Sequence, residues 1–323
     1  MTIVLLLAGL AILVFSGGVL IDGASGIAAR FRVPPALIGL TLVAFGTSLP
    51  ELAVNISATR AGSGDLSLGN IFGSNIANLG LVLGAAVSIK GFRVEGQIMR
   101  REIPLLLLIT AITLTVAGDG LLRGASPILD RGDAVVLLLL FLMFIYINFT
   151  EIVSGQPDDP LLTQAEGRAP AGDHGRHYLY VALGIPGLWL GGELTVSNAE
   201  TLALSFGLSK TLVGLSVVAV GTSLPELVTS ITAALRGESD LAIGNVIGSN
   251  LVNTLFILPI SAFIMPLEVT PGAMLDIWTC LLFTVIVSIF AVSARQRLSR
   301  VEGWLLLAGY FYYIAWRYQA FGI

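Results

Sequence analysis

The heptapeptide GTSLPEL occurs twice in the chain, at residues 46–52 and at 221–227. Each copy is followed at the same distance by a second motif, which reads GNIFGSNIAN at 69–78 and GNVIGSNLVN at 244–253. An ungapped alignment of the surrounding stretches gives 24 identical residues in 50 positions. Two parts of the chain are therefore copies of one unit, and corresponding residues lie 175 positions apart.

The composition is that of a protein embedded in a membrane. Of the 323 residues, 55% are hydrophobic and only 12% are charged, whereas soluble domains carry about 25% charged residues. We therefore expect an all-α integral membrane protein surrounded by the lipid bilayer, and we exclude a water-soluble enzyme. The net charge of −4 and the absence of a Lys/Arg cluster argue against a nucleic-acid partner. Nothing in the sequence indicates an obligatory protein partner.

Apolar runs that are long enough to cross a bilayer predict ten transmembrane helices, because a span takes roughly 20 residues. One polar stretch, residues 154–177, separates two halves of five helices each, residues 1–153 and 178–323. Because five is odd, the second half enters the membrane from the opposite side, which makes the repeats inverted. The helices are expected near 2–21, 35–59, 66–89, 102–118, 133–151, 178–204, 209–234, 240–265, 271–293 and 302–320.

The basic residues predict the orientation of these helices. With ten spans, twelve of the 17 Lys and Arg residues fall on one side of the membrane, the side that holds the 154–177 linker. Cytoplasmic loops carry the excess of Lys and Arg. We therefore expect a multi-pass protein of the cell (inner) membrane, with a cytoplasmic linker and with both termini outside.

Two glutamates lie inside apolar segments, where each charged side chain costs roughly 2.5–3.5 kcal/mol on insertion scales. Glu51 and Glu226 are corresponding residues of the two GTSLPEL motifs, and neither motif contains a Lys or Arg. Two carboxylates that face each other repel unless a cation lies between them or one of them binds a proton. The missing positive charge is therefore expected to come from bound cations.

Other residues of the repeated motifs supply neutral oxygen ligands. Hydroxyl and amide side chains recur at helical i, i+4 spacing, which puts them on common helix faces. Oxygen ligands without His or Cys suit calcium, sodium or magnesium rather than zinc or copper. The residues are Thr47, Ser74 and Asn78 in the first repeat and Thr222, Ser249 and Asn253 in the second.

Prolines predict a break in the helix before each glutamate. Pro50 and Pro225 lack an N–H and clash with the carbonyl four residues earlier, so we expect interrupted helices with free carbonyls around 44–47 and 219–222. Asn70 and Asn245 are expected to form hydrogen bonds with this opened backbone.

The duplicated GTSLPE and GNxxGSNxxN motifs resemble those of the sodium/calcium exchanger family of the cation/calcium antiporter superfamily, in its prokaryotic form, over nearly the whole chain. The resemblance implies a secondary antiporter that exchanges sodium for calcium by alternating access. It also implies that the first and sixth helices slide past the core, and that no cofactor is needed beyond the transported ions.

The resemblance further implies four ion sites in the middle of the membrane. It assigns the central calcium site to the carboxylates of Glu51 and Glu226 with the carbonyls of Thr47 and Thr222. It assigns the sodium sites to the carbonyls of Ala44 and Ala219 and to the side chains of Ser48, Ser74, Ser223 and Ser249. Asn78 and Asn253 complete the ring. Some relatives have an aspartate at one of these last two positions, so stoichiometry and potassium coupling are not transferred.

Three other functions remain open at this point. Proton/calcium or other cation/proton exchange is reasonable, because desolvated glutamates can titrate near neutrality. A passive cation channel would pass ions without a counter-ion. An intramembrane hydrolase built on Ser48 or Ser223 is disfavoured because both histidines, His174 and His177, fall in the polar linker.

Overall fold

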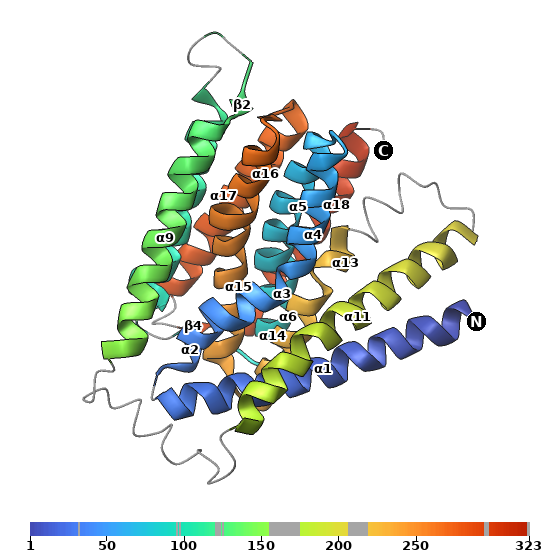
Figure 1. The fold of residues 1–323 in the computed structure, drawn as a ribbon, viewed down its shortest axis with the longest axis vertical. Helices are drawn as coiled ribbons and strands as arrows, with labels where there is room; N and C mark the ends of the chain where they lie inside the picture. The colour runs from blue at the N-terminus through green and yellow to red at the C-terminus, as the bar shows by residue number, and fades with distance from the viewer. Residues whose placement is uncertain are drawn as a thin grey trace.

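The computed structural model describes residues 1–31, 33–94, 96, 98–119, 124, 126–154, 175–205, 219–293 and 297–321. Within these ranges the protein is helical apart from turns and four two-residue strands (Figure 1). Most of the polar linker, residues 155–174, lies outside the described residues, as do residues 206–218.

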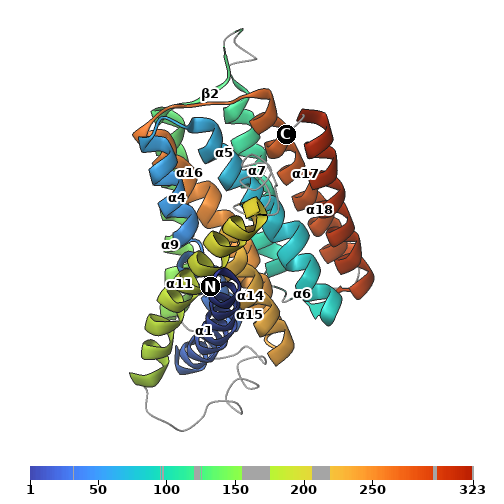
Figure 2. The same ribbon diagram turned by 90° about the vertical axis from the view of Figure 1, so that its right-hand side faces the viewer.

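Two long helices lie side by side along one flank of the molecule (Figures 1 and 2). They are α1 (Thr2–Phe31) and α11 (Gly175–Ser205). Their backbones approach closely at glycines: a Cβ on Gly184 would lie 2.9 Å from the Cβ of Leu20. The expected first helix, 2–21, was too short, because a 20-residue span assumes a helix perpendicular to the bilayer and α1 runs obliquely to the central helices. The helix α11 also includes His177, which was expected in the linker.

The repeated motifs form two matching sets of broken helices at the centre. In each set a short helix is followed by a longer one, and a third helix contains a π-helical stretch, a feature that is often found at functional sites. The first set is α2 (Pro35–Ile38), η1 (Gly39–Val43), α3 (Ala44–Thr47), α4 (Leu49–Arg60), α5 (Gly64–Ala77), η2 (Asn78–Val82) and α6 (Leu83–Ile89). The second is α13 (Ala219–Thr222), α14 (Leu224–Arg236), α15 (Ser239–Val252), η5 (Asn253–Ile257) and α16 (Leu258–Ile264).

The remaining helices surround this centre, and short strands connect their ends. The helices are η3 (Ile98–Glu102), α7 (Ile103–Ala117), α9 (Arg131–Ser154), α17 (Pro271–Ser293) and α18 (Arg300–Phe321). The strands are β1 (Phe92–Arg93), β2 (Ile128–Leu129), β3 (Leu267–Glu268) and β4 (Arg297–Leu298).

The strand pairing follows the sequence repeat. Strand β1 pairs antiparallel with β4, with Phe92 opposite Leu298, and β2 pairs antiparallel with β3, with Leu129 opposite Leu267. The 175-residue offset relates β1 to β3, and β4 and β2 are the respective partners of these two strands. Labels β2 and β4 lie toward opposite ends of the helices in Figure 1.

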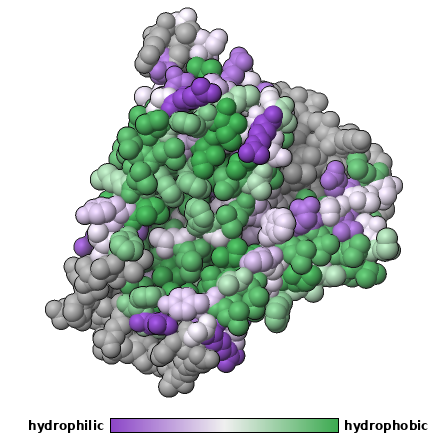
Figure 3. Space-filling model, viewed as in Figure 1, coloured by the Kyte–Doolittle hydropathy of each residue, from purple (hydrophilic) through white to green (hydrophobic). Residues whose placement is uncertain are grey.

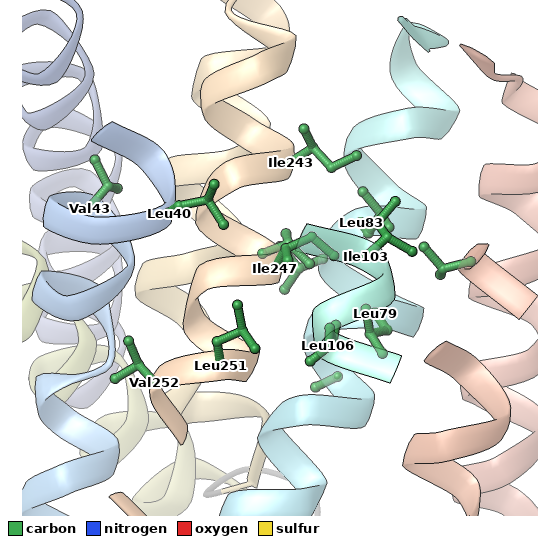
Figure 4. Packing of buried hydrophobic residues seen from close by; sticks show 14 of the residues in the cluster. Leu40, Val43, Leu79, Leu83, Ile103, Leu106, Ile243, Ile247, Leu251 and Val252 are labelled. Carbon is green, nitrogen blue, oxygen red and sulfur yellow. The ribbon is translucent and has the colours of Figure 1, made fainter. Parts of the chain in front are cut away.

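The helix α15 is the most enclosed element of the core. In Figure 4 its Ile247 lies between Leu40 on η1 and a group that includes Leu83 and Leu106, and all four side chains are buried. These leucine and isoleucine side chains contain no polar atom. Their packing holds α15 against η1 on one side and against α6 and α7 on the other.

One face of the molecule carries hydrophobic side chains over much of its area, with hydrophilic ones gathered toward its ends (Figure 3). Within the described residues, six helices are long and apolar enough to cross a membrane, and the bent pair Pro35–Thr47 and Leu49–Arg60 makes a seventh. Of the other three expected spans, α7 has only 15 residues, α18 is not among the six, and the span expected near 209–234 begins outside the described residues. Ten spans therefore stay a prediction.

A close approach of backbones holds α15 against η1, and it predicts the effect of adding one methyl group. A Cβ on Gly248 would lie 2.4 Å from the carbonyl oxygen of Leu40 and 2.7 Å from the Cβ of Ala44. We expect Gly248→Ala to destabilise the fold by about 1–3 kcal/mol, because Leu40 and Ala44 must move. Thermal unfolding in detergent measures the effect.

The matched control is Gly309→Ala in α18, where the nearest atom, on the Phe283 side chain, lies at the ordinary contact distance of 3.4 Å. A Gly248→Ala protein with the melting temperature of this control would contradict the packing argument.

Candidate cation site

Each repeat has a break in its helix one residue after the short helix. Ser48 and Ser223 share non-helical dihedrals, φ −85° and ψ 6°, and the first break bends the chain by 43°. A new helix begins at the next residue, with proline in its first turn, where a backbone N–H has no acceptor within the new helix. Glu51 and Glu226 therefore lie in the first turns of α4 and α14, where the helix dipole favours a negative charge.

The carbonyls at the first break differ from the expectation. The carbonyl oxygen of Ala44, expected to be free, accepts the N–H of Ser48 at 3.1 Å and the hydroxyl of Thr47 at 3.3 Å. Pro50 instead removes the helical donor of the Gly46 carbonyl, four residues earlier. Ala219 is the first residue of α13, in the corresponding place of the second repeat.

Both motif glutamates are fully buried, with 0% of their surface exposed. Neither Oε atom of Glu51 has a hydrogen-bond partner, and Oε2 of Glu226 has none. The ion pairs of the described residues join Arg101 to Glu102, Arg236 to Asp22 and Arg317 to Asp276, and none includes a motif glutamate. The two carboxyl groups are close enough to interact electrostatically. Among the described residues, this buried negative charge has no cationic partner.

Two equivalent hydroxyl–amide clusters lie beside the glutamates. Each joins a threonine at the end of a short helix to a serine and an asparagine of the opposite repeat, at 3.2–3.5 Å. The asparagines form hydrogen bonds with side chains rather than with the opened backbone, so the expectation for them was wrong: the hydroxyls of Thr47 and Thr222 lie within reach of their Oδ1 atoms. The clusters are Thr47 with Ser249 and Asn245, and Thr222 with Ser74 and Asn70.

The symmetry fails at the glutamates themselves. Oε1 of Glu226 accepts the hydroxyl of Ser48 at 3.1 Å and that of Ser249 at 3.5 Å. The corresponding hydroxyl of Ser223 has no partner, and neither has the carboxylate of Glu51. Glu226 is thus held by Ser48, a contact that Glu51 lacks, although the hydroxyls of Ser74 and Thr222 lie near the Glu51 carboxylate.

Two asparagines complete the set of unpartnered oxygens. Asn78 and Asn253 are the first residues of the π-helices η2 and η5, both are fully buried, and both Oδ1 atoms lack a partner. Their Nδ2 atoms donate to Asn250 and Asn75, respectively. Sequence reasoning missed Asn75 and Asn250, although each precedes a motif asparagine by three residues and so lies near it on the helix surface.

The chemistry of these atoms is that of a hard-cation site. Five buried oxygens of Glu51, Glu226, Asn78 and Asn253 lack a donor, and unpaired buried acceptors are costly unless a ligand satisfies them. Among the described residues there is no group of three or more His, Cys, Asp and Glu side chains, as a zinc or copper site requires. Two carboxylates with neutral oxygens fit sodium or calcium.

A cavity of about 320 Å³ borders this region. Its walls come from α4, α11 and the α13–α14 break, and Glu193 is the charged residue in its lining. The lining includes Pro50, Ser57, Trp189, Glu193, Thr222 and Pro225.

The corresponding surface of the other repeat is closed by α1. A Cβ on Gly17 would lie 3.0 Å from the side chain of Val228 on α14. At the end of α14, Arg236 donates to the carbonyl of Gly18 at 2.9 Å and to the carboxylate of Asp22. The pathway on this side is therefore filled, and the site is approached from the α4 side.

Comparison with known proteins places the chain in a family. The family model described as "Sodium/calcium exchanger protein" matches residues 1–150 and 176–319. The chain is 36% identical to the putative antiporter CaxA of Alkalimonas amylolytica, over 96% of each chain. It is 35% identical to the inner membrane protein YrbG of Escherichia coli, over 97% of this chain and 96% of the relative.

A solved structure has the same fold. The sodium-calcium exchanger NCX_Mj, in a structure soaked with Na⁺ and Ca²⁺, superposes with a TM-score of 0.81 at 29% identity and covers 97% of each chain. Family match, relatives and fold agree with the motifs from which the site was built. The chain belongs to the sodium/calcium exchanger family of the cation/calcium antiporter superfamily, a family of ion transporters and not of enzymes.

Proposed function

We propose that the protein is a secondary active antiporter that exchanges sodium for calcium by alternating access. The observation that carries the proposal is the group of five buried oxygens without donors, three of them on carboxylates that lack a cationic partner. The ligands that we assign are the carboxylates of Glu51 and Glu226, the side chains of Ser48, Ser74, Asn78, Ser223, Ser249 and Asn253, and the carbonyls of Ala44, Thr47, Ala219 and Thr222.

Exchange follows from the charge of this site. With both glutamates ionised the site carries about −2, which one Ca²⁺ or two Na⁺ balance. Simultaneous binding of both species leaves an excess of buried positive charge, which repels further cations. Sodium and calcium are therefore expected to occupy the site at different times, and each is released when the other binds.

Alternating access is supported by the unequal contacts of α1 and α11. The cavity beside α11 is open, whereas α1 packs on α14 over the corresponding surface. Because the repeats share their motifs, the opposite arrangement, with α1 withdrawn and α11 packed on α4, is a second conformation of similar energy. A carrier that switches between the two exposes the same ions to each side in turn.

For the membrane arrangement we propose ten transmembrane helices in two inverted repeats, residues 1–153 and 178–323, joined by a cytoplasmic linker, 154–177. The corresponding strands β1 and β3 pair with β4 and β2, whose labels lie toward opposite ends of the helices in Figure 1, and this supports the inversion. The excess of basic residues on the linker side supports an orientation with both termini outside the cell membrane. The open cavity then faces outward.

Cysteine labelling tests this orientation. In a Cys280→Ala background, we expect a cysteine at Ala61, an exposed residue after α4, to react with an impermeant thiol reagent in intact cells. A cysteine at Ala165 in the linker should react only after the cytoplasmic face is opened, because the two loops are predicted to lie on opposite sides. The reverse labelling pattern would invert the proposed topology.

Cation/proton exchange is the second candidate, and the same buried carboxylates favour it. When no metal ion is bound, two facing carboxylates in a water-poor site relieve their repulsion by binding a proton. A proton can then replace sodium as the counter-ion.

Calcium uptake into sodium-loaded proteoliposomes tests the proposal against this alternative. We expect uptake that requires internal sodium and causes no stoichiometric change of internal pH. Uptake that persists in sodium-free vesicles and releases protons would replace sodium by protons in the proposed function.

A further inference from the structure

The two ring asparagines are held by their nitrogen ends. Nδ2 of Asn78 donates to Oδ1 of Asn250 at 3.1 Å, and Nδ2 of Asn253 donates to Oδ1 of Asn75 at 3.0 Å. These are corresponding hydrogen bonds of the two repeats, because the 175-residue offset exchanges them. In both, the amide oxygen is left buried and without a partner.

The orientation of such an amide decides whether it is a ligand. The oxygen of an asparagine accepts and binds cations, whereas its NH₂ group only donates. Rotation of either side chain by half a turn would replace a ligand oxygen with a donor group that repels the cation. Because the oxygen and the nitrogen occupy nearly the same volume, packing alone cannot select between these orientations.

A backbone carbonyl fixes the orientation on one side. Nδ2 of Asn250 donates to the carbonyl oxygen of Asn75 at 3.2 Å. A carbonyl can only accept, so Asn250 must present its NH₂ group there and its Oδ1 to Asn78. Asn78 must then donate to Asn250, and its own oxygen points away from that contact.

On the other side, the chain of hydrogen bonds from Asn253 through Asn75 ends on a hydroxyl group. Nδ2 of Asn75 donates to Oγ1 of Thr254 at 2.9 Å. A hydroxyl both donates and accepts, so this contact fixes Asn75, and through it Asn253, less strictly than a carbonyl does. The position that corresponds to Thr254 in the first repeat is Leu79, so the hydroxyl belongs to one repeat only.

We propose that Asn75 and Asn250 are positioning residues of the exchanger: they do not bind the ions, but hold Asn253 and Asn78 with their oxygens toward them. The inference rests on the proposed cation site. It extends the functional set to the third residue of each GSN sequence and to Thr254.

The two chains of hydrogen bonds are separable by mutation. Asn75→Leu removes the acceptor of Asn253 and keeps the backbone carbonyl that holds Asn250. Asn250→Leu removes the acceptor of Asn78 and leaves the Asn75–Asn253 bond. We expect each variant to lower calcium affinity 10–100-fold, the usual effect of losing a residue that orients a metal ligand. The maximal rate should change less than the affinity.

Crossed rescue distinguishes positioning from packing. A carboxylate presents an oxygen in either orientation, so Asn253→Asp should restore calcium affinity to Asn75→Leu, and Asn78→Asp should restore it to Asn250→Leu. The crossed pairs, Asn75→Leu with Asn78→Asp and Asn250→Leu with Asn253→Asp, carry the same charge and should not be restored. Calcium half-saturation is measured in proteoliposomes at fixed sodium for every variant, including the two aspartate single variants.

Affinity restored in matched pairs at least tenfold more than in crossed pairs is the expected result. Calcium affinity restored equally in all four double variants would overturn the inference. So would a lack of restored affinity in the two matched double variants when these elute as folded protein. If a leucine variant does not fold, the same crossed set with Asn75→Ala and Asn250→Ala is decisive. Absence of sodium-dependent calcium uptake in the parent would instead reject the proposed function, so the two failures are distinguishable.

Thr254→Val gives an independent check, because it leaves every atom of the Asn250–Asn78 chain in place. We expect a smaller loss of calcium affinity than in Asn75→Leu, restored by Asn253→Asp and not by Asn78→Asp. Restoration by Asn78→Asp would contradict the assignment of Thr254 to the Asn253 side.

Discussion

Glu51→Gln and Glu226→Gln are each expected to reduce calcium transport by more than 100-fold while the protein stays folded. The amide keeps the volume of the side chain and removes the charge that offsets the dehydration of Ca²⁺. Folding should not suffer, because a buried neutral amide avoids the cost of a buried charge, roughly 2.5–3.5 kcal/mol per residue on insertion scales. Calcium uptake into sodium-loaded proteoliposomes, with thermal unfolding of the same preparations, measures both effects.

The matched control is Glu268→Gln, the same substitution at an exposed residue of β3, which should transport at the parental rate. Near-normal calcium flux in either motif variant would reject the assignment of the two carboxylates to the calcium site.

Asn253→Asp is expected to make calcium transport depend more steeply on pH, or to make it newly responsive to potassium. The substitution adds a third carboxylate to a site that carries about −2, and the added charge repels the other two. An additional monovalent cation or a proton relieves that repulsion. As pH falls, protons should compete with calcium more strongly in the variant than in the parent. Calcium uptake measured across pH, with and without potassium, gives both profiles.

Asn250→Asp is the matched comparison for Asn253→Asp. It adds the same charge at residue 250, and the new carboxylate still offers Asn78 an oxygen acceptor. Identical pH and potassium profiles for Asn253→Asp and the parent would show that residue 253 does not face the ions.

The sequence was sufficient to locate the buried carboxylates. Glu51 and Glu226 follow from two observations, an apolar context and the lack of a basic neighbour, and both hold wherever the surrounding helices pack. The same is true of Ser74 and Ser249, because helical spacing puts each on one face with the following motif asparagine. It is not true of Thr47 and Thr222, because the helix breaks between each threonine and its glutamate. The part of the helix expected near 209–234 that precedes Ala219 lies outside the described residues.

Contacts between helices could not be predicted from the sequence. Asn75 and Asn250 gain their role from donors on the opposite repeat, and no local pattern specifies which side chains of two separate helices meet. The length of α1 was also missed, because the sequence shows neither that this helix runs obliquely nor that Gly23 and Gly26 near its end pack against α11.

The difference between the two repeats was also unpredictable. Ser48 and Ser223 have the same neighbours in sequence, yet Ser48 donates to Glu226 and Ser223 has no partner. A duplicated sequence specifies both arrangements equally, and the observed asymmetry is the choice of one conformation. The contacts of Arg236 with Gly18 and Asp22 have a different origin: the residue that corresponds to Arg236 is Ala61, so the first repeat cannot form them.

Obligatory coupling is the central claim, and calcium efflux from calcium-loaded proteoliposomes tests it most directly. Efflux is followed after dilution into media that contain sodium, or choline at three pH values, with the membrane potential clamped. A sodium/calcium antiporter predicts rapid efflux into sodium and almost none into choline at any pH. Efflux into choline at a rate comparable to that into sodium would contradict the account, because calcium would then be leaving without sodium as its counter-ion.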